Sequence, residues 1–430
     1  MRVLVVGSGG REHALGWALA RSALVDDVVF APGNPGMEAL GECRPVDVED
    51  AVAIAATADA VDAALTVVGP EVPLVAGAVD AVESTGRRAF GPRAAAAQLE
   101  GSKAWMKEVL VAAGVPTARH ATFTVGDADA ALVFLESLPG LYVVKTDGLA
   151  AGKGVVVTES LADARDAVRS YLSGEAFGDA GRTLVIEEGL TGPELSLLVL
   201  CAGGNIAPLA PAQDFKRIGD GDTGPNTGGM GAYSPVPAAS DTIVGDVLDR
   251  AVMPTLLELR RRGVDYRGVL YAGLMLTPDG MKVLEYNVRF GDPECQVVVP
   301  RLETDLAQHC LEVADGTVST ARFGNDACVT VVLATAGYPA SARTGDVITG
   351  LDAAARVPGV VVFHAATARN NGEFVTAGGR VLDVTATAPT LAEARVRAYE
   401  AAAAISWPGI QYRTDIAGEA AARGDLPSKW

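Results

Sequence analysis

The chain has 430 residues, of which 49% are hydrophobic and 20% charged, enough for about three domains with ordinary cores. Its net charge is −18, with 35 Lys and Arg against 53 Asp and Glu. So acidic a chain is a poor candidate for non-specific binding to nucleic acid or anionic membranes, although a local pocket can still hold a small anion. Five scattered cysteines without a C-x-x-C pair and no apolar stretch of about 18 residues favour a cytoplasmic protein without transmembrane helices.

The first hundred residues alternate between short apolar strands and helices. The expected strands are Arg2–Val6, Val28–Ala31, Leu65–Val68 and Arg88–Phe90, and the expected helices are Glu12–Arg21, Ala51–Thr57 and about Val75–Thr85. This rhythm is typical of an open parallel sheet with helices on both faces. The sequence therefore predicts a Rossmann-like α/β domain over residues 1–102.

The pattern of expected helices and strands changes after Gly101. Helices are expected at Ser102–Ala113, Leu132–Leu138 and Thr242 to about Arg262, and strands at Tyr142–Lys145, Val155–Thr158, Thr183–Glu188, Glu194–Cys201, Ile206–Pro211, Val269–Leu276 and Met281–Asn287. Glycine loops join several of them, including a long polar loop at Gly219–Gly231. From residue 326, short strands precede a helix at Leu391–Ile405, which opens with a capping box at Thr390. These patterns predict a second α/β domain over 103–325 and a small α+β domain over 326–430.

A glycine turn follows the first strand and contains Gly9, Gly10, Arg11 and Glu12. A strand, a glycine turn and a helix N-terminus together present backbone N–H groups to a phosphate. Glu12 stands where a dinucleotide fold has its third glycine, and no acidic residue ends the second strand, which disfavours NAD. A phosphate or sugar-phosphate site is favoured here, and a purely structural turn remains the alternative.

A second glycine loop, which contains Gly148, Gly152, Lys153 and Gly154, lies between two expected strands of a hairpin. It differs from a P-loop because Gly154 leads into β-branched residues rather than a helix. Such a loop, with Lys145 beneath it, can fold down over a triphosphate and exclude water. A solvated hairpin tip is the alternative.

Acidic and amide side chains end two later strands. Glu187, Glu188 and Leu190, with Glu194 shortly after, can offer backbone groups to an adenine edge and a carboxylate to ribose hydroxyls, although such residues are usually solvated. Glu285 and Asn287 share one face of a strand, and Arg289 follows on the same face. Two oxygen ligands from one strand suit Mg²⁺, which completes its shell with nucleotide phosphates and water, and Arg289 can hold a phosphoryl oxygen.

A further polar segment contains Asp214 and Lys216 and is followed by the Gly-, Asn- and Thr-rich loop Asp222–Gly231. It suits a phosphate or a hydroxylated substrate, and an ordinary surface loop is the alternative. Only seven of the 35 basic residues are lysines, and Lys103, Lys145, Lys153 and Lys216 lie in or beside these polar segments. Lysine acts as a compact point charge toward phosphates.

Together these segments resemble the phosphoribosylamine–glycine ligase (glycinamide ribonucleotide synthetase) family of the ATP-grasp superfamily. The resemblance spans essentially the whole chain and is carried by the motifs Val6–Ala14, Ala31–Asn34, Val68–Glu71, Gly101–Lys103, Asp147–Gly154, Asp222–Gly231 and Arg289–Glu294. It implies an ATP-grasp domain over 103–325 with a lid subdomain at about 119–190. The implied reaction joins glycine to 5-phosphoribosylamine, with ATP and Mg²⁺ (or Mn²⁺), through a glycyl phosphate in purine biosynthesis.

The resemblance also implies roles for individual residues. ATP phosphates would meet Lys103, Lys145 and the Gly148–Gly154 loop with Gly152 and Lys153; the adenosine would meet Glu187, Glu188, Leu190 and Glu194; the metal would meet Glu285 and Asn287; and phosphoribosylamine would meet Gly9, Gly10, Arg11, Glu12, Asp214 and Lys216. Arg289, Lys145 and Asp214 would be catalytic, with Asp292 near glycine. We expect small-molecule substrates only, no nucleic-acid or membrane partner, and a monomer or weak homodimer.

Two positions depart from the family pattern. Thr146 follows Lys145 where alanine is common, and Phe215 stands where histidine is expected between Asp214 and Lys216. Alternatives to the ligase are another ATP-grasp ligase such as a carboxylase, a nucleotide-binding oxidoreductase built on the first glycine turn, and a non-catalytic nucleotide sensor.

Overall fold

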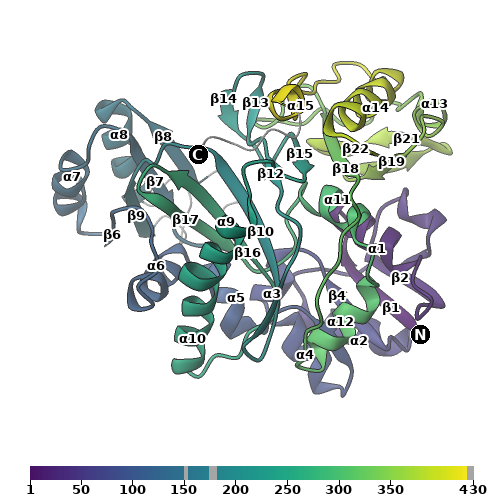
Figure 1. The fold of residues 1–430 in the computed structure, drawn as a ribbon, viewed down its shortest axis with the longest axis horizontal. Coiled ribbons are helices and arrows are strands. Elements are labelled where there is room, and N and C mark those ends of the chain that lie inside the picture. The colour runs from purple at the N-terminus through teal and green to yellow at the C-terminus, as the bar shows by residue number, and fades with distance from the viewer. Residues whose placement is uncertain (150–153, 174–181, 424–430) are drawn as a thin grey trace.

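The N-terminal part of the chain forms a five-stranded parallel sheet in the order β3-β2-β1-β4-β5. We describe residues 1–149, 154–173 and 182–423 in a computed structural model (Figure 1). The strands are β1 (Arg2–Gly7), β2 (Asp27–Pro32), β3 (Glu42–Cys43), β4 (Leu65–Val68) and β5 (Arg88–Phe90), and the helices are α1 (Gly10–Leu19), α2 (Ala51–Ala60), α3 (Glu71–Val75), α4 (Ala78–Ser84) and α5 (Ala94–Gly101), with a 3-10 turn η1 (Met37–Ala39). The predicted parallel α/β sheet is confirmed.

One helix predicted in this layer is shorter than expected. The helix expected at about Val75–Thr85 corresponds to α4, and the separate short helix α3 precedes it. Gly77 lies between them with a φ of +88°, a conformation that ends a right-handed helix and that glycine adopts at little cost.

A smaller lobe stands at the left of Figure 1 and is built on an antiparallel sheet in the order β6-β9-β7-β8. Its elements are β6 (His120–Thr124), α7 (Ala128–Glu136), β7 (Tyr142–Thr146), β8 (Val155–Thr158), α8 (Leu161–Leu172) and β9 (Thr183–Glu188). Strands β7 and β8 pair antiparallel, as the sequence predicts. Leu135, Val144, Val168 and Ile186 form part of a separate core between the helices and this sheet.

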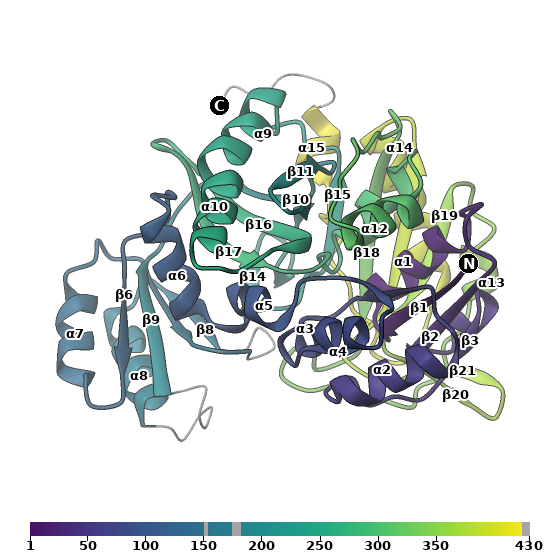
Figure 2. The same ribbon diagram turned by 90° about the horizontal axis from the view of Figure 1, so that it is seen from below.

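The central lobe has an antiparallel sheet in the order β11-β10-β16-β17. Its elements are α6 (Lys103–Ala112), β10 (Glu194–Ala202), β11 (Asn205–Pro208), α9 (Asp241–Val247), a π-helical segment η3 (Leu248–Val252), α10 (Met253–Arg261), β16 (Arg267–Thr277), β17 (Gly280–Asn287), α11 (Cys295–Val298), a 3-10 turn η4 (Val299–Arg301) and α12 (Leu306–Ala314). Figure 2 shows α6 between this sheet and the small lobe, and α5 between this sheet and helices α3 and α4 of the N-terminal domain. The strands are largely buried aliphatic runs, which fits a sheet covered by helices.

The C-terminal module shares a sheet with the central lobe, in the order β12-β15-β18-β22-β19. Its elements are β12 (Gln213–Asp214), β15 (Gly231–Ser234), β18 (Ala327–Ala334), α13 (Leu351–Ala354), β19 (Val360–His364), β22 (Arg380–Ala388), α14 (Leu391–Ala404) and α15 (Gly418–Arg423), with hairpins β13 (Arg217–Gly219)–β14 (Thr223–Asn226) and β20 (Thr367–Asn370)–β21 (Glu373–Thr376). Since β15 pairs with β18, the C-terminal module is continuous with the polar segment that contains Asp214.

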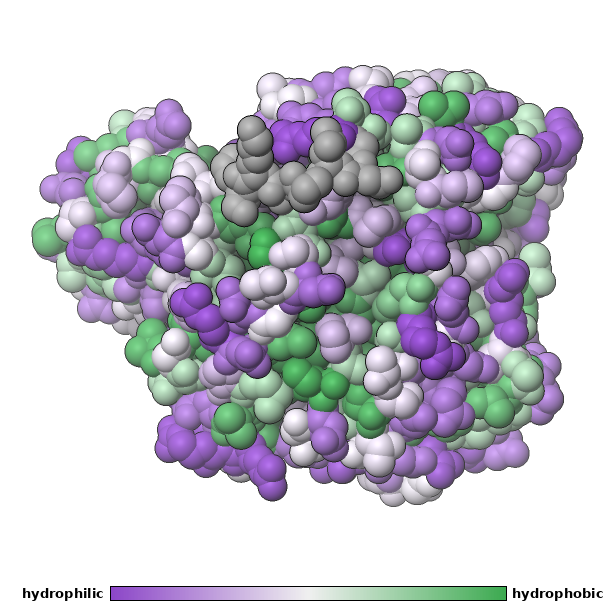
Figure 3. Space-filling model, in the orientation of Figure 1, coloured by the Kyte–Doolittle hydropathy of each residue, from purple (hydrophilic) through white to green (hydrophobic). Residues whose placement is uncertain are grey.

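Hydrophilic and hydrophobic residues are interspersed over the face seen in Figure 3, and the small lobe is set apart from the body at its upper edge. Across the described ranges, none of the helices is both long and apolar enough to cross a bilayer.

Two histidines join the N-terminal domain to the C-terminal module. The backbone N–H of His364, at the end of β19, donates to Nδ1 of His13 on α1 at 2.9 Å. Both rings are nearly buried. Burial and the neighbouring His364 lower the pKa of His13 to about 3, and burial together with Arg369 lowers the pKa of His364 to about 4. Both histidines are therefore neutral in the folded protein at pH 7.

We expect this pair to make stability depend on pH. Between about pH 6.5 and 4 the unfolded chain binds protons at these histidines that the folded protein does not, so their contribution to the free energy of unfolding falls as pH falls through this window and is constant above it. Urea unfolding at several pH values measures the slope. The variant His13→Gln keeps an acceptor for the His364 N–H but does not titrate, so its slope should be shallower than that of the wild type. Equal slopes would remove His13 from this effect.

Candidate functional site

The metal-binding side chains predicted on β17 lie on one face of the strand, where several cations converge. Glu285 and Asn287 are both partly buried. Burial by itself would raise the pKa of Glu285, but the charges of Lys216, Lys145, Lys103 and Arg289 outweigh it and lower the pKa. Glu285 is thus ionised and lies in the positive field of cations from four separate segments. A carboxylate and an amide oxygen two residues apart fit the ligand chemistry of Mg²⁺.

Arg289 joins this strand to the N-terminal domain. Its guanidinium pairs with Glu100 of α5 at 2.6 Å and with Glu71 of α3 at 3.2 Å, and it donates to Oδ1 of Asn287 at 3.3 Å. The Val288 N–H also donates to Glu100, at 2.8 Å. Burial raises the pKa of Glu100 to about 7 despite Arg289, so one of the two carboxylates that hold Arg289 titrates close to neutrality.

The second glycine loop contacts Lys103 where the loop begins. Nζ of Lys103 donates to the carbonyl of Gly148 at 2.7 Å, and Ser102, the N-cap of α6, donates to Asp147 at 3.0 Å. Gly148 has a φ of +75°, which explains glycine at this turn. Gly154 closes the hairpin by accepting from the Thr146 N–H at 2.8 Å. Gly152 and Lys153 lie outside the described residues.

The carboxylates predicted near the adenosine are engaged by lysines. Glu187 is 2% exposed and contacts Nζ of Lys145 and of Lys107, each at 3.0 Å. Glu188 pairs with Lys282 at 3.3 Å, and Glu194 pairs with Lys216 at 2.6 Å. The structure therefore turns the Glu187 side chain toward Lys107 and Lys145, which leaves contacts with a base to the backbone or to Leu190.

Asp214 and Lys216 lie on the same side of the chain as Glu194, and Phe215 lies on the opposite side. Burial, opposed by Lys216 but supported by Glu294, Glu194 and Glu285, raises the pKa of Asp214 to about 8. An Asp214 carboxyl that retains a proton near neutral pH can donate as well as accept.

Phe215 has a structural role. Its ring lies 4.8 Å from the guanidinium of Arg413 and 6.2 Å from the ring of Tyr233. Side chains alternate along an extended segment, so this position faces the C-terminal module rather than the site. Thr146, the other departure, is fully buried, and its hydroxyl has no hydrogen-bond partner among the described residues. Nothing in the structure explains that substitution.

The first glycine turn is lined by the protein's own carboxylates. The Gly9 N–H donates to Glu12 at 2.7 Å, and Arg11 pairs with Glu12 at 2.5 Å and donates to the carbonyl of Phe290 at 3.0 Å. A side chain at Gly10 would collide with Asp383. The turn presents acceptors beside its backbone donors, which suits hydroxyl or amine groups of a ligand as well as an anion.

Comparisons with known proteins agree over the full length. Family models described as phosphoribosylglycinamide synthetase match residues 1–100 (N domain), 101–295 (ATP-grasp domain) and 328–419 (C domain). A Streptomyces coelicolor protein named phosphoribosylamine–glycine ligase is 50% identical over 427 residues, which cover 98% of this chain and 100% of that protein. The chain belongs to the phosphoribosylamine–glycine ligase family.

Solved structures support the same family. The crystal structure of phosphoribosylamine–glycine ligase from Thermotoga maritima matches with a TM-score of 0.85 at 35% identity and covers 97% of this chain and 100% of that chain. The biotin carboxylase domain of 2-oxoglutarate carboxylase from Hydrogenobacter thermophilus, solved with MgADP, matches with a TM-score of 0.72 at 19% identity, over 96% of this chain and 91% of that chain, which shows a shared fold. The predicted ATP-grasp ligase and its α/β architecture are therefore confirmed.

Residues that the sequence did not indicate contact the predicted site residue Asp292. Asp292 pairs with Arg380 of β22 at 2.8 Å, and Gln296 donates to Asp292 at 2.7 Å and to Asp383 at 2.9 Å. Arg380 and Asp383 come from the C-terminal module, about ninety residues after Asp292, so no local pattern signals them. Lys107 could have been placed near the site from the sequence, because it lies one helical turn after Lys103 on the same face of the helix.

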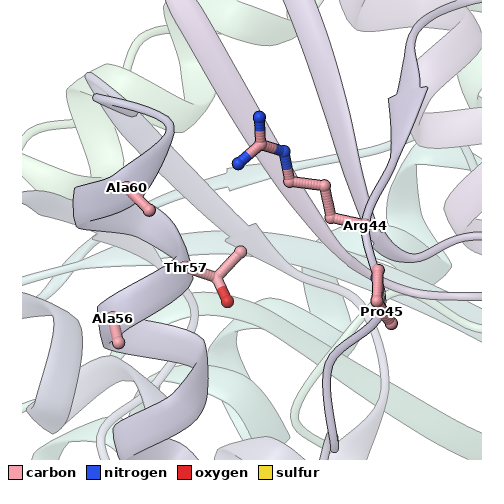
Figure 4. Close-up of a pocket in the computed structure, with 5 residues that line it drawn as sticks. All are labelled: Arg44, Pro45, Ala56, Thr57 and Ala60. Carbon is pink, nitrogen blue, oxygen red and sulfur yellow. The ribbon is translucent and has the colours of Figure 1, made fainter.

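A separate hollow of about 460 Å³ lies on the N-terminal domain, between α2 and the segment after β3, and is lined by Arg44, Pro45, Ala56, Thr57 and Ala60 (Figure 4). Its polar groups are engaged. Arg44 pairs with Glu42 at 2.9 Å and the Thr57 hydroxyl donates to the carbonyl of Ala53 at 2.8 Å. None of its lining residues is among those assigned to the ligase site.

Proposed function

We propose that this protein joins glycine to 5-phosphoribosylamine and converts ATP to ADP and phosphate, forming glycinamide ribonucleotide. The observation that carries the proposal is the face of β17, where Arg289 donates to Asn287 and the charges of Lys103, Lys145, Lys216 and Arg289 act on Glu285. Phosphoryl transfer is catalysed mainly by positioning and by neutralising charge on the phosphate oxygens. Oxygen ligands for Mg²⁺ beside four cations would supply both the positioning of the phosphates and the neutralisation of their charge.

In the proposed reaction a carboxylate oxygen of glycine attacks the γ-phosphorus of ATP, and ADP leaves. The amine of phosphoribosylamine then attacks the carbonyl carbon of the resulting glycyl phosphate, loses a proton, and expels inorganic phosphate. Mg²⁺ (or Mn²⁺), bound by Glu285 and Asn287, would neutralise phosphate charge. Lys103 and Lys145 would hold the ATP phosphates, with Gly148, Gly152, Lys153 and Gly154 covering them, and Arg289 would hold the transferred phosphoryl group.

The acceptor would bind between the first glycine turn and the polar segment of β12. Gly9, Gly10, Arg11 and Glu12 would hold phosphoribosylamine from one side, and Asp214 with Lys216 from the other. The carboxylates of this region, including Asp292, suit the amine and hydroxyl groups of the two substrates. Asp214, whose raised pKa keeps it protonated near neutral pH, is suited to donate a hydrogen bond to a substrate oxygen.

The domain bounds predicted from the sequence, 1–102, 103–325 with a lid at about 119–190, and 326–430, remain part of this proposal. So do a cytoplasmic location, a monomer or weak homodimer, and substrates limited to small molecules. The lid would close over ATP through the loop that begins at Gly148.

An omission assay tests the function. ADP release should require glycine, phosphoribosylamine and Mg²⁺ together. Bicarbonate in place of glycine tests the carboxylase alternative, and NADH fluorescence tests the oxidoreductase. Brisk ADP release without glycine, or saturable micromolar binding of NADH, would contradict the proposal.

A further inference from the structure

Lys107 is a buried lysine next to the proposed ATP site. Its side chain is 1% exposed, and lysine is rarely so buried without a specific partner. Nζ of Lys107 donates to Glu187 at 3.0 Å and to the Thr117 hydroxyl at 2.7 Å. These two contacts hold the ammonium between the small lobe and the central lobe.

The contacts of Lys107 continue on both sides. The other carboxylate oxygen of Glu187 lies 3.0 Å from Nζ of Lys145 on β7. The Thr117 hydroxyl donates to the carbonyl of Val283 on β17 at 2.7 Å. A connected series therefore runs from Lys145, assigned to the ATP phosphates, through Glu187, Lys107 and Thr117 to the strand that contains the metal ligands.

The charges in this series favour phosphate binding. Glu187 contacts two lysines, so the three groups together keep one net positive charge beside the ATP site. Without Lys107, the buried Glu187 carboxylate would neutralise Lys145, and its attraction for a phosphate would weaken. Without its contact with Lys107, the Glu187 carboxylate would also lose the interaction that fixes its orientation toward Lys145.

We propose that Lys107 is a positioning residue for ATP, which orients Glu187 and preserves the net positive charge of Lys145. This inference rests on the proposed function, because it assigns Lys145 to the nucleotide phosphates. Lys107 itself is buried and paired with Glu187, so it would act through Glu187 rather than by contact with the substrate.

The test compares Lys107→Met with Lys107→Arg in the full-length protein. Methionine keeps much of the volume and removes the charge, so KM for ATP and the Kd for the MgATP analogue AMPPNP should both rise about tenfold, equivalent to about 1.4 kcal/mol. The kcat should change less than about threefold, because Lys107 acts on ground-state binding. Lys107→Arg should recover at least half of the lost affinity on a logarithmic scale.

Lys282→Met is the matched control. Lys282 pairs with Glu188, beside Glu187, and its side chain is 25% exposed, so the substitution makes the same charge change at a neighbouring glutamate. It should shift the Kd for AMPPNP less than about twofold. Equal shifts in Lys107→Met and Lys282→Met, or an unchanged Kd in Lys107→Met, would overturn the proposal.

A second variant and a binding measurement complete the test. If Lys107→Met does not fold, Thr117→Val removes the other contact of Lys107 and should raise the Kd for AMPPNP in the same direction, whereas an unchanged Kd would overturn the proposal. Calorimetric binding of AMPPNP does not require turnover. A wild-type protein that binds AMPPNP but makes no glycinamide ribonucleotide would refute the proposed function and still allow the Lys107 inference to be judged.

Discussion

Replacing Glu285 with Gln is expected to lower kcat by about a thousandfold, the scale on which enzymes depend on one preorganised electrostatic group. Glutamine keeps the size and the oxygen but loses the charge that Mg²⁺ prefers. The lowered pKa of Glu285 means that the carboxylate is ionised throughout the neutral range, so the whole effect should be present at pH 7. Steady-state ADP release at saturating substrates measures it, and raising Mg²⁺ should recover part of the lost rate.

Asp279→Asn is the control for Glu285→Gln. Asp279 lies in the exposed turn between β16 and β17, so the substitution removes one negative charge from the same hairpin without changing a residue of the site. It should keep nearly full activity. A Glu285→Gln protein that is folded and retains more than about a tenth of wild-type kcat would exclude Glu285 as a metal ligand.

The second large effect is expected at Arg289. Arg289→Met should lower kcat/KM for glycine by about a thousandfold, because an arginine that stabilises transferred phosphoryl charge can supply a factor of 10³ or more. Arg289→Lys keeps the charge but loses the planar fork, so we expect an intermediate loss of about ten- to a hundredfold. Initial rates at varied glycine and fixed saturating ATP measure both variants.

Removing Arg289 also leaves two carboxylates without their partner. Glu71 and Glu100 both pair with it, so thermal melting should show that Arg289→Met is less stable than Arg289→Lys. Arg261→Met, at a guanidinium that is 70% exposed on α10, provides the control with near wild-type activity. If Arg289→Lys and Arg289→Met lose the same small factor, below about threefold, Arg289 does not contact the reacting group.

The parts of the fold that local patterns determine were predictable. Apolar runs such as Leu65–Val68 match β4, and the capping box at Thr390 marks the start of α14, whose N-cap is Thr390. Pairing between distant segments was not predictable in the same way. The sheet that joins β15 to β18 depends on contacts between residues about a hundred positions apart, and the sequence therefore suggested a separate C-terminal module.

The same distinction applies to the site. Glu285, Asn287 and Arg289 were found because alternation along one strand places them on one face. The partners of Glu187 were not found, since Lys107 and Lys145 come from α6 and β7 and meet it only in the folded protein. Asp383 was missed for the same reason, because only the fold brings the C-terminal module against Gly10.

The acidic composition is also better understood in the structure. The excess of negative charge is greatest in residues 103–325, the part proposed to bind ATP. Glu187, Glu188 and Glu194 are each paired with a lysine, so these carboxylates organise cations rather than oppose a nucleotide. Net charge argues against bulk binding of polyanions but not against one nucleotide in such a site.

The most direct test of the account follows oxygen-18 from the carboxylate of labelled glycine during turnover with ATP, Mg²⁺ and phosphoribosylamine. An acyl-phosphate route predicts that each glycinamide ribonucleotide formed is accompanied by one inorganic phosphate with a single oxygen-18 atom, while the amide keeps the other. Mass spectrometry of product and phosphate measures both. Amide product with unlabelled phosphate would contradict the glycyl phosphate, and ATP consumption without amide product would contradict the ligase function itself.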